Sequence, residues 1–342
     1  MFFYKKIRFI CHFRQISQKN LASKFLILSV FWRIPENSKM TYSKAAPVVN
    51  PPKSKNLPLS LAVSFIIILF LLIFQDNATV IPILGFHGVI NNKNSVTQLE
   101  QGRMHYPQKN LERFLEYLLI NDYWFITSQD LYEILSNQNH TNSDLFVKKK
   151  PIMISFDDGY RTVYTNLLPV LKKLEKKYGK KVKVVLFINP GALSKKSSVN
   201  STNLSCQELR DGLQQGFYDI QSHGLNHKDL TRLSNKNLIE ELLESQNELR
   251  KCTHDLDPQQ KVASHFAYPY GAYNQRVQKY VSKYYLSGYL YNNKILNRSF
   301  LKNQYEIPRL TVNRQESVQD LIEKFDTTFN EKSMKFLDKK LN

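Results

Sequence analysis

The stretch "PIMISFDDGYRTV", residues 151–163, ends a run of apolar residues with two adjacent aspartates. The apolar run, Ile152 to Phe156, has the composition of a buried β-strand. Two neighbouring carboxylates repel each other and resist removal from water, so Asp157 and Asp158 require a positive group close by. The rest of the chain has to supply that group.

Outward from this stretch, apolar runs alternate with amphipathic segments from residue 80 onwards. Strand-like runs occupy 80–86, 123–126, 152–156, 182–188, 217–221, 264–269, 286–291 and 305–312, and helical patterns occupy 108–120, 127–135, 164–179, 206–216, 234–251, 274–284 and 317–329. This alternation predicts an α/β fold with a parallel sheet or barrel. Functional residues of such folds gather at the carboxyl ends of the strands, where the two aspartates are expected to lie.

The composition suits a globular domain with a basic N-terminal extension. The 342 residues carry a formal charge of +19. Residues 1–56 hold eleven Lys and Arg against Glu36 alone, about +10, which leaves about +9 for the other 286 residues. That remainder suits an anionic surrounding such as a cell envelope. The chain shows no arginine-rich helix and no zinc-finger spacing, so we expect no nucleic-acid partner.

Three cysteines, Cys11, Cys206 and Cys252, form no metal-binding or redox motif. The last two could pair if the domain is exported, or they could serve as small core residues, which is the more common use of such cysteines.

A membrane span is predicted at residues 57–74, "LPLSLAVSFIIILFLLIF", which contain no charge and only Ser60 and Ser64 as polar side chains. Eighteen residues are about the minimum that crosses a bilayer core. Lysines precede the span and Gln75, Asp76 and Asn77 follow it, so the N-terminus is expected in the cytoplasm and the domain on the extracytoplasmic side. A cleaved signal peptide is the alternative, but no clear small-x-small cleavage site follows. A buried soluble helix is disfavoured because the stretch is apolar all round.

The predicted organisation is therefore a basic cytoplasmic tail (1–56), a single anchor (57–74), a catalytic domain (80–330) and a polar tail (331–342). Residues 1–39 lack clear periodicity, and Met40 opens a more ordinary basic tail. Our hypothesis is that residues 1–39 are dispensable or untranslated, and N-terminal sequencing of the native protein tests it.

Two histidines follow the strand predicted at 217–221, in the sequence "SHGLNH". His223 and His227 are four residues apart, a spacing that lets two imidazoles bind one ion. Alone this spacing is weak evidence, and surface or capping histidines are the plainer reading. Combined with an aspartate at another strand end it predicts a site of two His and one carboxylate, which leaves positions open for water and substrate.

A third strand end carries "FAYPYGAYN", residues 266–274. Pro269 and Gly271 mark a turn, and Tyr268, Tyr270 and Tyr273 surround it with aromatic rings that suit the apolar faces of sugars. An ordinary Pro–Gly turn with packed tyrosines explains the segment equally well.

Taken in order, these segments resemble the polysaccharide deacetylases of carbohydrate esterase family 4, the NodB-homology group. The family motif TFDDG corresponds to "SFDDG" (155–159), and H-[ST]-x-x-H corresponds to "HGLNH" (223–227), with Gly224 replacing Ser or Thr. The third motif, R-x-P-Y-G, corresponds to "AYPYG" (267–271), with Ala267 in place of the arginine. The resemblance covers about residues 80–320 and implies a distorted (β/α) barrel.

The departures from the family pattern indicate one particular branch of this family. The chain has no convincing D-x-x-D-W or late L-x-H motif, and the latter supplies the acid histidine elsewhere in the family. Instead "IPILGFHGV" (81–89) resembles the opening segment of the poly-β-1,6-N-acetylglucosamine deacetylases of biofilm formation, which implies that His87 is the acid.

The resemblance implies a divalent metal, with zinc as the first candidate, held by Asp158, His223 and His227. It also implies Asp157 as the general base and His87 as the general acid. The substrate-binding residues that it implies are Tyr160, Pro269, Tyr270 and Gly271, and loops 91–106 and 189–205 are expected to frame the cleft.

With Ala267 unable to orient the base, Arg309 is a possible substitute from a late strand, although it could equally be a surface or strand-end residue. The remaining histidines match no motif and are expected to be structural or exposed: His12, His105, His140, His254 and His265.

The expected partner is a polysaccharide containing N-acetylglucosamine, while its linkage, the metal and the oligomeric state are not readable from the sequence. Two other functions were weighed. An inactive, glycan-binding homologue would explain the missing arginine and Gly224. A nucleotide-sugar transferase would use the paired aspartates for magnesium, but it lacks a glycine-rich phosphate loop, and paired histidines favour a softer metal.

Overall fold

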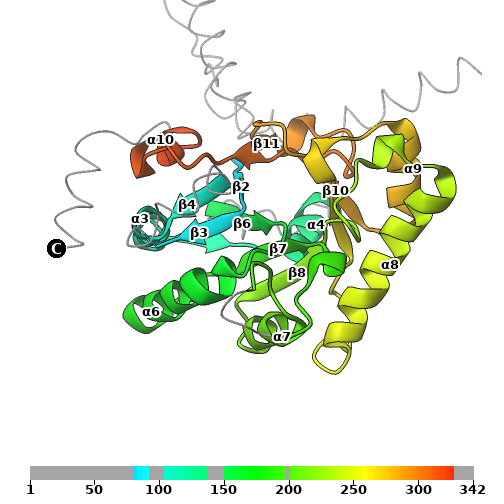
Figure 1. Ribbon diagram of the computed structural model, residues 1–342. Helices are drawn as coiled ribbons and strands as arrows, with labels where there is room; N and C mark the ends of the chain where they lie inside the picture. The colour runs from blue at the N-terminus through cyan, green and yellow to red at the C-terminus, as the bar shows by residue number, and fades with distance from the viewer. Residues whose placement is uncertain (1–79, 92–103, 137–149, 197–200, 327–342) are drawn as a thin grey trace, which may run out of the picture. The chain divides into compact units, whose positions relative to one another are not determined.

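The computed structural model describes residues 80–91, 104–136, 150–196 and 201–326 (Figure 1). The predicted basic tail, the predicted membrane span and the predicted polar tail lie outside these residues, so their prediction stands untested. Among the described residues, no helix combines the length and the apolar character that a membrane span requires.

Eight strands form the main sheet, and every pairing within it is parallel. The strand order is β10-β9-β8-β7-β6-β2-β12, and β5 pairs with the first half of β6. The strands are β2 (Ile83–Phe86), β5 (Tyr123–Phe125), β6 (Lys150–Asp157), β7 (Val184–Ile188), β8 (Tyr218–Ser222), β9 (His265–Ala267), β10 (Ser287–Tyr289) and β12 (Leu310–Thr311). The predicted α/β class with a parallel sheet is confirmed.

The sheet forms an open half-barrel, which agrees with the distorted (β/α) barrel that the family resemblance implied. In the described part of the chain, β10 and β12 are the two edges and do not pair with each other. The backbone between them is mostly irregular, with β11 (Leu296–Asn297) and a short turn at Arg298–Phe300 in place of a closing strand. An isolated parallel bridge pairs Tyr289 with Ile307 there.

The helices surround the sheet, as Figure 1 shows for α6, α7 and α8. Side chains of Ser205, Ser234, Asn274 and Ser317 accept hydrogen bonds from N–H groups of the first turn and so fix where four of the helices begin. The helices are α3 (Gln108–Ile120), α4 (Ser128–Ser136), α6 (Leu168–Tyr178), α7 (Cys206–Gln214), α8 (Asn235–Thr253), α9 (Gln275–Tyr284) and α10 (Val318–Glu323).

Smaller elements flank the sheet. The strand predicted at 80–86 is divided into β1 (Val80–Ile81), which pairs antiparallel with β11, and β2. β3 (Gly88–Ile90) pairs with β4 (His105–Pro107), a pairing that local patterns did not indicate. A π-helical turn, Val163–Leu167, leads into α6, and short 3₁₀ turns follow three strands at Pro190–Ala192, Leu230–Arg232 and Pro269–Gly271.

Alternation along β6 places the first aspartate inside the half-barrel. Ile152, Ile154 and Phe156 join the cluster beneath the helices. Met153 joins the inner cluster with residues of neighbouring strands. Because successive side chains of a strand point to opposite faces, Asp157 shares the inner face with Met153.

A disulfide between Cys206 and Cys252 joins the first residue of α7 to the end of α8. The sequence left pairing open and favoured core residues, and the structure shows the pair.

Candidate active site

The predicted site residues meet at one edge of the sheet. Asp157 is the last residue of β6, His87 directly follows β2, His223 directly follows β8, and Pro269 follows β9 by two residues. Since the strands are parallel, their carboxyl ends lie on the same side, and residues more than a hundred positions apart become neighbours.

Asp158, His223 and His227 form a cluster whose potential ligand atoms all lie within 4.8 Å of one another. Asp158 Oδ1 is 3.5 Å from His223 Nε2 and 3.3 Å from His227 Nε2. A left-handed backbone at Asp158, with φ 70°, turns this residue away from the direction of the strand. This oxygen is buried and has no hydrogen-bond partner among the described residues, and such an atom needs a cation or a water.

The imidazole of His223 is held in the orientation that a ligand needs. Its Nδ1 lies 2.8 Å from the carbonyl oxygen of Ala267, so Nδ1–H donates there and Nε2 is free to face Asp158. Burial lowers the pKa of His223 to about 4, which keeps the ring neutral. Burial also lowers the pKa of His227. The donor set of two neutral imidazoles and one carboxylate fits a divalent metal of the zinc type.

Arg309 forms a bidentate ion pair with Asp157. Its two terminal nitrogens donate to the two carboxylate oxygens at 2.7 Å each, and its Nε–H donates to the carbonyl of Leu290 at 2.9 Å. The guanidinium also lies over the rings of Phe187 and Tyr291, at 5.0 Å and 5.4 Å from their centroids. The structure therefore places Arg309 in the position that orienting Asp157 requires.

The two adjacent aspartates differ in their electrostatic surroundings. Burial alone would raise the pKa of Asp157, but Arg309 and then His223 and His87 outweigh it and lower this pKa to about 2. Burial raises the pKa of Asp158 to about 6, and the charge of Asp157 adds to this rise. Asp157 is thus kept ionised by protein groups, whereas the charges of His87 and Arg309 do not offset the effect of burial on Asp158.

His87 lies at the same centre. It is 9% exposed, its ring meets that of Tyr291 edge-on at 5.4 Å, and its charge lowers the pKa of both aspartates. Its Nδ1 is buried and has no hydrogen-bond partner within the described ranges. The predicted acid is therefore close to the predicted base.

The four predicted substrate residues frame this centre. Tyr270 is 70% exposed, has a left-handed φ of 59°, and packs its ring against His227 at 4.4 Å. Pro269 is buried, and Gly271 turns the chain with φ 65° at a point where a Cβ would lie 3.2 Å from the carbonyl oxygen of Tyr291. Tyr160 lines the same cleft as Asp158 and His227, and its ring lies 4.5 Å from that of His105.

An open cleft extends from Asp158 and His227 toward part of the loop predicted to frame it. Its lining includes Asp158, Tyr160, Asn189, Asn203, Asn226 and His227. Three of its lining residues are asparagines, whose side-chain amides both donate and accept hydrogen bonds, as ligands rich in hydroxyl and acetamido groups require.

Two polar residues of the site were missed by sequence reasoning. The side-chain amide of Asn189 donates to the carbonyl oxygens of His223 and Gly224, and a position directly after β7 was the available signal. His105, expected to be structural or exposed, is 6% exposed and lies beside Gly88, and burial lowers its pKa to about 4.

The other histidines agree with their prediction where the structure describes them. His265 is buried under the sheet and His254 is exposed. His12 and His140 lie outside the described residues.

Comparison with known proteins gives a consistent family. Residues 146–288 match the sequence model of the family described as polysaccharide deacetylase. YxkH of Bacillus subtilis is 27% identical over 203 residues, which are 59% of this chain and 61% of that protein. The poly-β-1,6-N-acetyl-D-glucosamine N-deacetylase of Staphylococcus aureus is 28% identical over 193 residues, 54% of this chain and 61% of that protein. The chain thus spans about three fifths of the length of these relatives.

Solved structures share the fold. A polysaccharide deacetylase from Bacillus cereus matches with a TM-score of 0.58 and 21% identity, over 72% of this chain and 68% of that one. The Streptococcus pyogenes deacetylase PplD, solved with acetate, matches with a TM-score of 0.59 and 21% identity, over 72% of this chain and 98% of that one. The solved structures show the shared fold, and the family model shows that residues 146–288 of this chain form a domain of the polysaccharide deacetylase type.

Proposed function

We propose that this protein is a metal-dependent N-deacetylase that removes acetyl groups from a glycan containing N-acetylglucosamine. The observation that carries the proposal is the adjacency of two differently paired aspartates. Asp157 is bound by Arg309, and Asp158 faces His223 and His227 with an unpartnered oxygen. One strand end thus provides both a base and a metal ligand.

Asp158, His223 and His227 would hold the metal. A divalent ion there would supply Lewis-acid chemistry, which polarises an amide carbonyl and lowers the pKa of water. The neutral state of the two imidazoles and the free oxygen of Asp158 are what such an ion requires of its ligands.

Asp157 is proposed to take a proton from the water that attacks the acetamido carbon. Arg309 keeps this carboxylate ionised and fixes its plane, while each oxygen retains a lone pair for the proton. The N–H of Tyr270, in the turn after β9, is proposed to donate to the oxygen that becomes negative.

His87 is proposed to donate a proton to the leaving nitrogen as the C–N bond breaks. Water and amide are thereby converted into acetate and a free glucosamine amine. The burial of His87 and its electrostatic effect on both aspartates support this role.

The substrate class rests on similarity and on the lining of the cleft. A relative of 28% identity is named for poly-β-1,6-N-acetyl-D-glucosamine. Tyr160 in the cleft and the exposed Tyr270 beside His227 offer aromatic surface near the cluster. A biofilm or cell-envelope polysaccharide of this type is the proposed substrate.

Residues 57–74 are proposed to anchor the domain on the extracytoplasmic side of the membrane, on the strength of the sequence alone. An anchored protein stays in the membrane fraction after alkaline carbonate washing, and external protease digests its domain in intact cells. Release into the wash would refute the anchor.

The test of the catalytic proposal is acetate release from a panel of N-acetylglucosamine oligomers, with zinc content measured on the same samples. We expect Asp157→Asn and His87→Ala to lose about 10²–10⁴-fold in kcat while retaining metal. Asp158→Ala should lose the metal as well as the activity. A chelator should abolish turnover of the wild type, and added Zn²⁺ should restore it.

An inactive glycan-binding homologue would bind the same oligomers without releasing acetate under any metal condition. Wild-type rates in Asp157→Asn would contradict the assignment of the base.

A further inference from the structure

A buried carboxylate that the proposed reaction does not use contacts residues 223–227, which we call the histidine loop. Glu241, on α8, is 3% exposed. Its Oε2 accepts a hydrogen bond from the backbone N–H of Asn226, and its Oε1 accepts one from the side-chain amide of the same residue, both at 2.9 Å. The carbonyl of Glu241 accepts a third bond, from the N–H of Leu225, at 3.1 Å. Lys228 is the nearby cation, 3.5 Å from Oε1 and half exposed.

The loop held by Glu241 has an unfavourable backbone. Gly224 has φ 78° and His227 has φ 54°, so two of its five residues are left-handed. A left-handed conformation costs a non-glycine residue free energy and persists only where the surroundings enforce it. The orientation of His227 as a ligand therefore depends on contacts outside the loop.

The segment that follows β7 makes a second set of contacts with the loop. Asn189 donates to the carbonyls of His223 and Gly224, and the N–H of Gly191 donates to the carbonyl of Leu225 at 2.9 Å. A Cβ at Gly191 would lie 2.4 Å from Oδ1 of Asn226, so the two segments are in close contact. The loop is thus fixed between the turn after β7 and the helix α8.

Gly224 gives a reason for the contact between Glu241 and the histidine loop in this chain. The family pattern places Ser or Thr here, whose hydroxyl could form a hydrogen bond within the loop. A Cβ at Gly224 would lie 3.5 Å from Oε2 of Glu241, so the carboxylate lies directly beside the position that lacks a side chain. The N–H groups of Asn226 provide the attachment instead.

We propose that Glu241 and Asn226 form a clamp that positions His227 to bind the metal, a role that rests on the metal site proposed above. Glu241 is a positioning residue, since it acts on the ligand through the loop. Loss of such an outer hydrogen bond typically weakens metal binding 10–100-fold.

The experiment compares five variants of the full-length protein in detergent: Glu241→Gln, Asn226→Ala, His227→Ala and two controls. Zn²⁺ affinity is measured by competition with a chelator, the visible spectrum of the Co²⁺-loaded form reports ligand geometry, and thermal unfolding of the metal-free form reports stability. Glu241→Gln and Asn226→Ala should raise the Kd for Zn²⁺ by 10–100-fold and alter the Co²⁺ spectrum. Glutamine retains the size of the side chain but only one acceptor oxygen for two donors.

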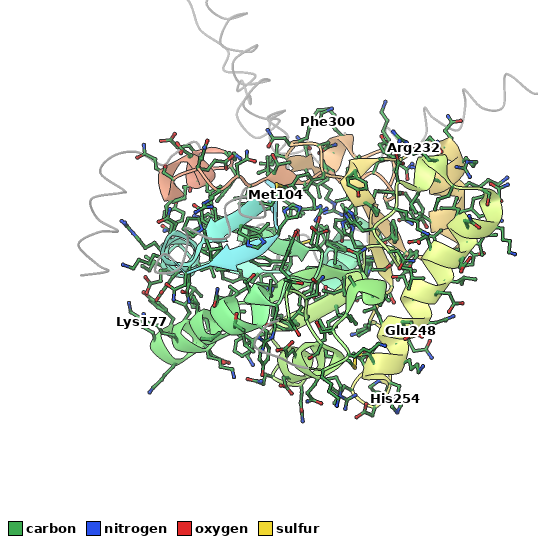
Figure 2. All side chains as sticks on the ribbon, in the orientation of Figure 1. Met104, Lys177, Arg232, Glu248, His254 and Phe300 are labelled. Atoms are coloured by element: carbon green, nitrogen blue, oxygen red, sulfur yellow. A yellow bond between two sulfur atoms is a disulfide. The ribbon has the colours of Figure 1, made fainter. Side chains whose placement is uncertain are left out.

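Two control variants come from the same helix. Glu248→Gln changes an exposed carboxylate of α8, labelled in Figure 2, and should leave both affinity and spectrum unchanged. Leu242→Ala removes a buried apolar side chain next to Glu241 in sequence, and it should lower the unfolding temperature without weakening Zn²⁺ binding.

The outcomes separate the clamp from the metal site. If Glu241→Gln binds Zn²⁺ as the wild type does while His227→Ala does not, the clamp is wrong and the proposed site stands. If Leu242→Ala weakens binding as much as Glu241→Gln, general destabilisation explains the effect and the clamp is wrong. If the wild type shows no binding that depends on His227, the proposed site and the clamp both fail.

Discussion

At the scale of single residues, the pairing of Arg309 with Asp157 solves one of the two charge problems posed by the adjacent aspartates. Arg309 is fully buried, and both of its terminal nitrogens are within 2.7 Å of the carboxylate. The aromatic rings on either side exclude water and add cation–π attraction. Asp158 has no such partner among the residues that the structure describes, which is why the two adjacent aspartates can have different roles.

Arg309→Met should destabilise the protein by about 3–5 kcal/mol, because it leaves Asp157 buried without its cation. Arg309→Lys should retain more stability, since it keeps the charge, but it should lose activity because one ammonium cannot bind both oxygens in one plane. Urea unfolding of the metal-free protein and acetate release measure the two effects.

A matched control is Arg232→Met, an arginine that is largely exposed and labelled in Figure 2. It should change stability by no more than about 0.5 kcal/mol. Wild-type stability and turnover in Arg309→Met would contradict the role of Arg309.

At the scale of secondary-structure elements, the predicted alternation of strands and helices matches the structure closely. Each long helical pattern forms a helix, and α3 has the predicted bounds, 108–120. Small elements were missed, such as the pairing of β3 with β4, because two or three residues carry no periodicity of their own. The two edges of the half-barrel, β10 and β12, stay unpaired because the described chain between them holds only the short strand β11.

The disulfide is a prediction at this scale, since it ties α7 to α8. Its cysteines are 46 residues apart, and closing a loop of this length in the unfolded chain is worth about 4 kcal/mol in the entropic account. Replacing both Cys206 and Cys252 by Ser should lower the free energy of unfolding by about that amount. Urea unfolding in the presence and absence of a reductant measures it.

The Ser double variant should itself be insensitive to reductant. If the wild type is equally insensitive, and its two thiols react with alkylating reagents before unfolding, the bond is not formed in the protein.

At the scale of the whole molecule, buried neutral histidines make the fold sensitive to acid. His265 is fully buried, where its Nδ1 lies 2.7 Å from the hydroxyl of Ser287, and burial lowers its pKa to about 3. In the unfolded chain its pKa returns to about 6.5, so the unfolded state binds more protons between pH 3 and 6.5. Stability from this residue is complete above pH 6.5 and decreases as the pH falls through that window.

Lowering the pH from 7.5 to 5 should therefore cost the wild type about 2 kcal/mol through His265. His265→Gln should be less stable at pH 7.5 but should lose less on acidification, because glutamine does not titrate. Urea unfolding at several pH values checks the slope. An identical slope in the variant and the wild type would show that His265 does not contribute to acid sensitivity.

Much of the site followed from the sequence alone. The apolar run before Asp157, the histidine spacing and the alternation of elements are local patterns. Such patterns can be recognised in the sequence without knowledge of the fold. Together they placed Asp157, Asp158, His223 and His227 at strand ends that a parallel sheet brings to one edge.

Only the tertiary structure decided which groups complete the site. Arg309 is 152 residues from Asp157, and Glu241 meets Asn226 from a helix that has its own periodic pattern. Such contacts depend on strand order, on register and on how far the sheet closes. Periodic patterns in the sequence therefore do not predict them. The sequence by itself determined the chemistry available to this protein, whereas the path of the chain through space decided which buried charges are paired and which one still requires a cation.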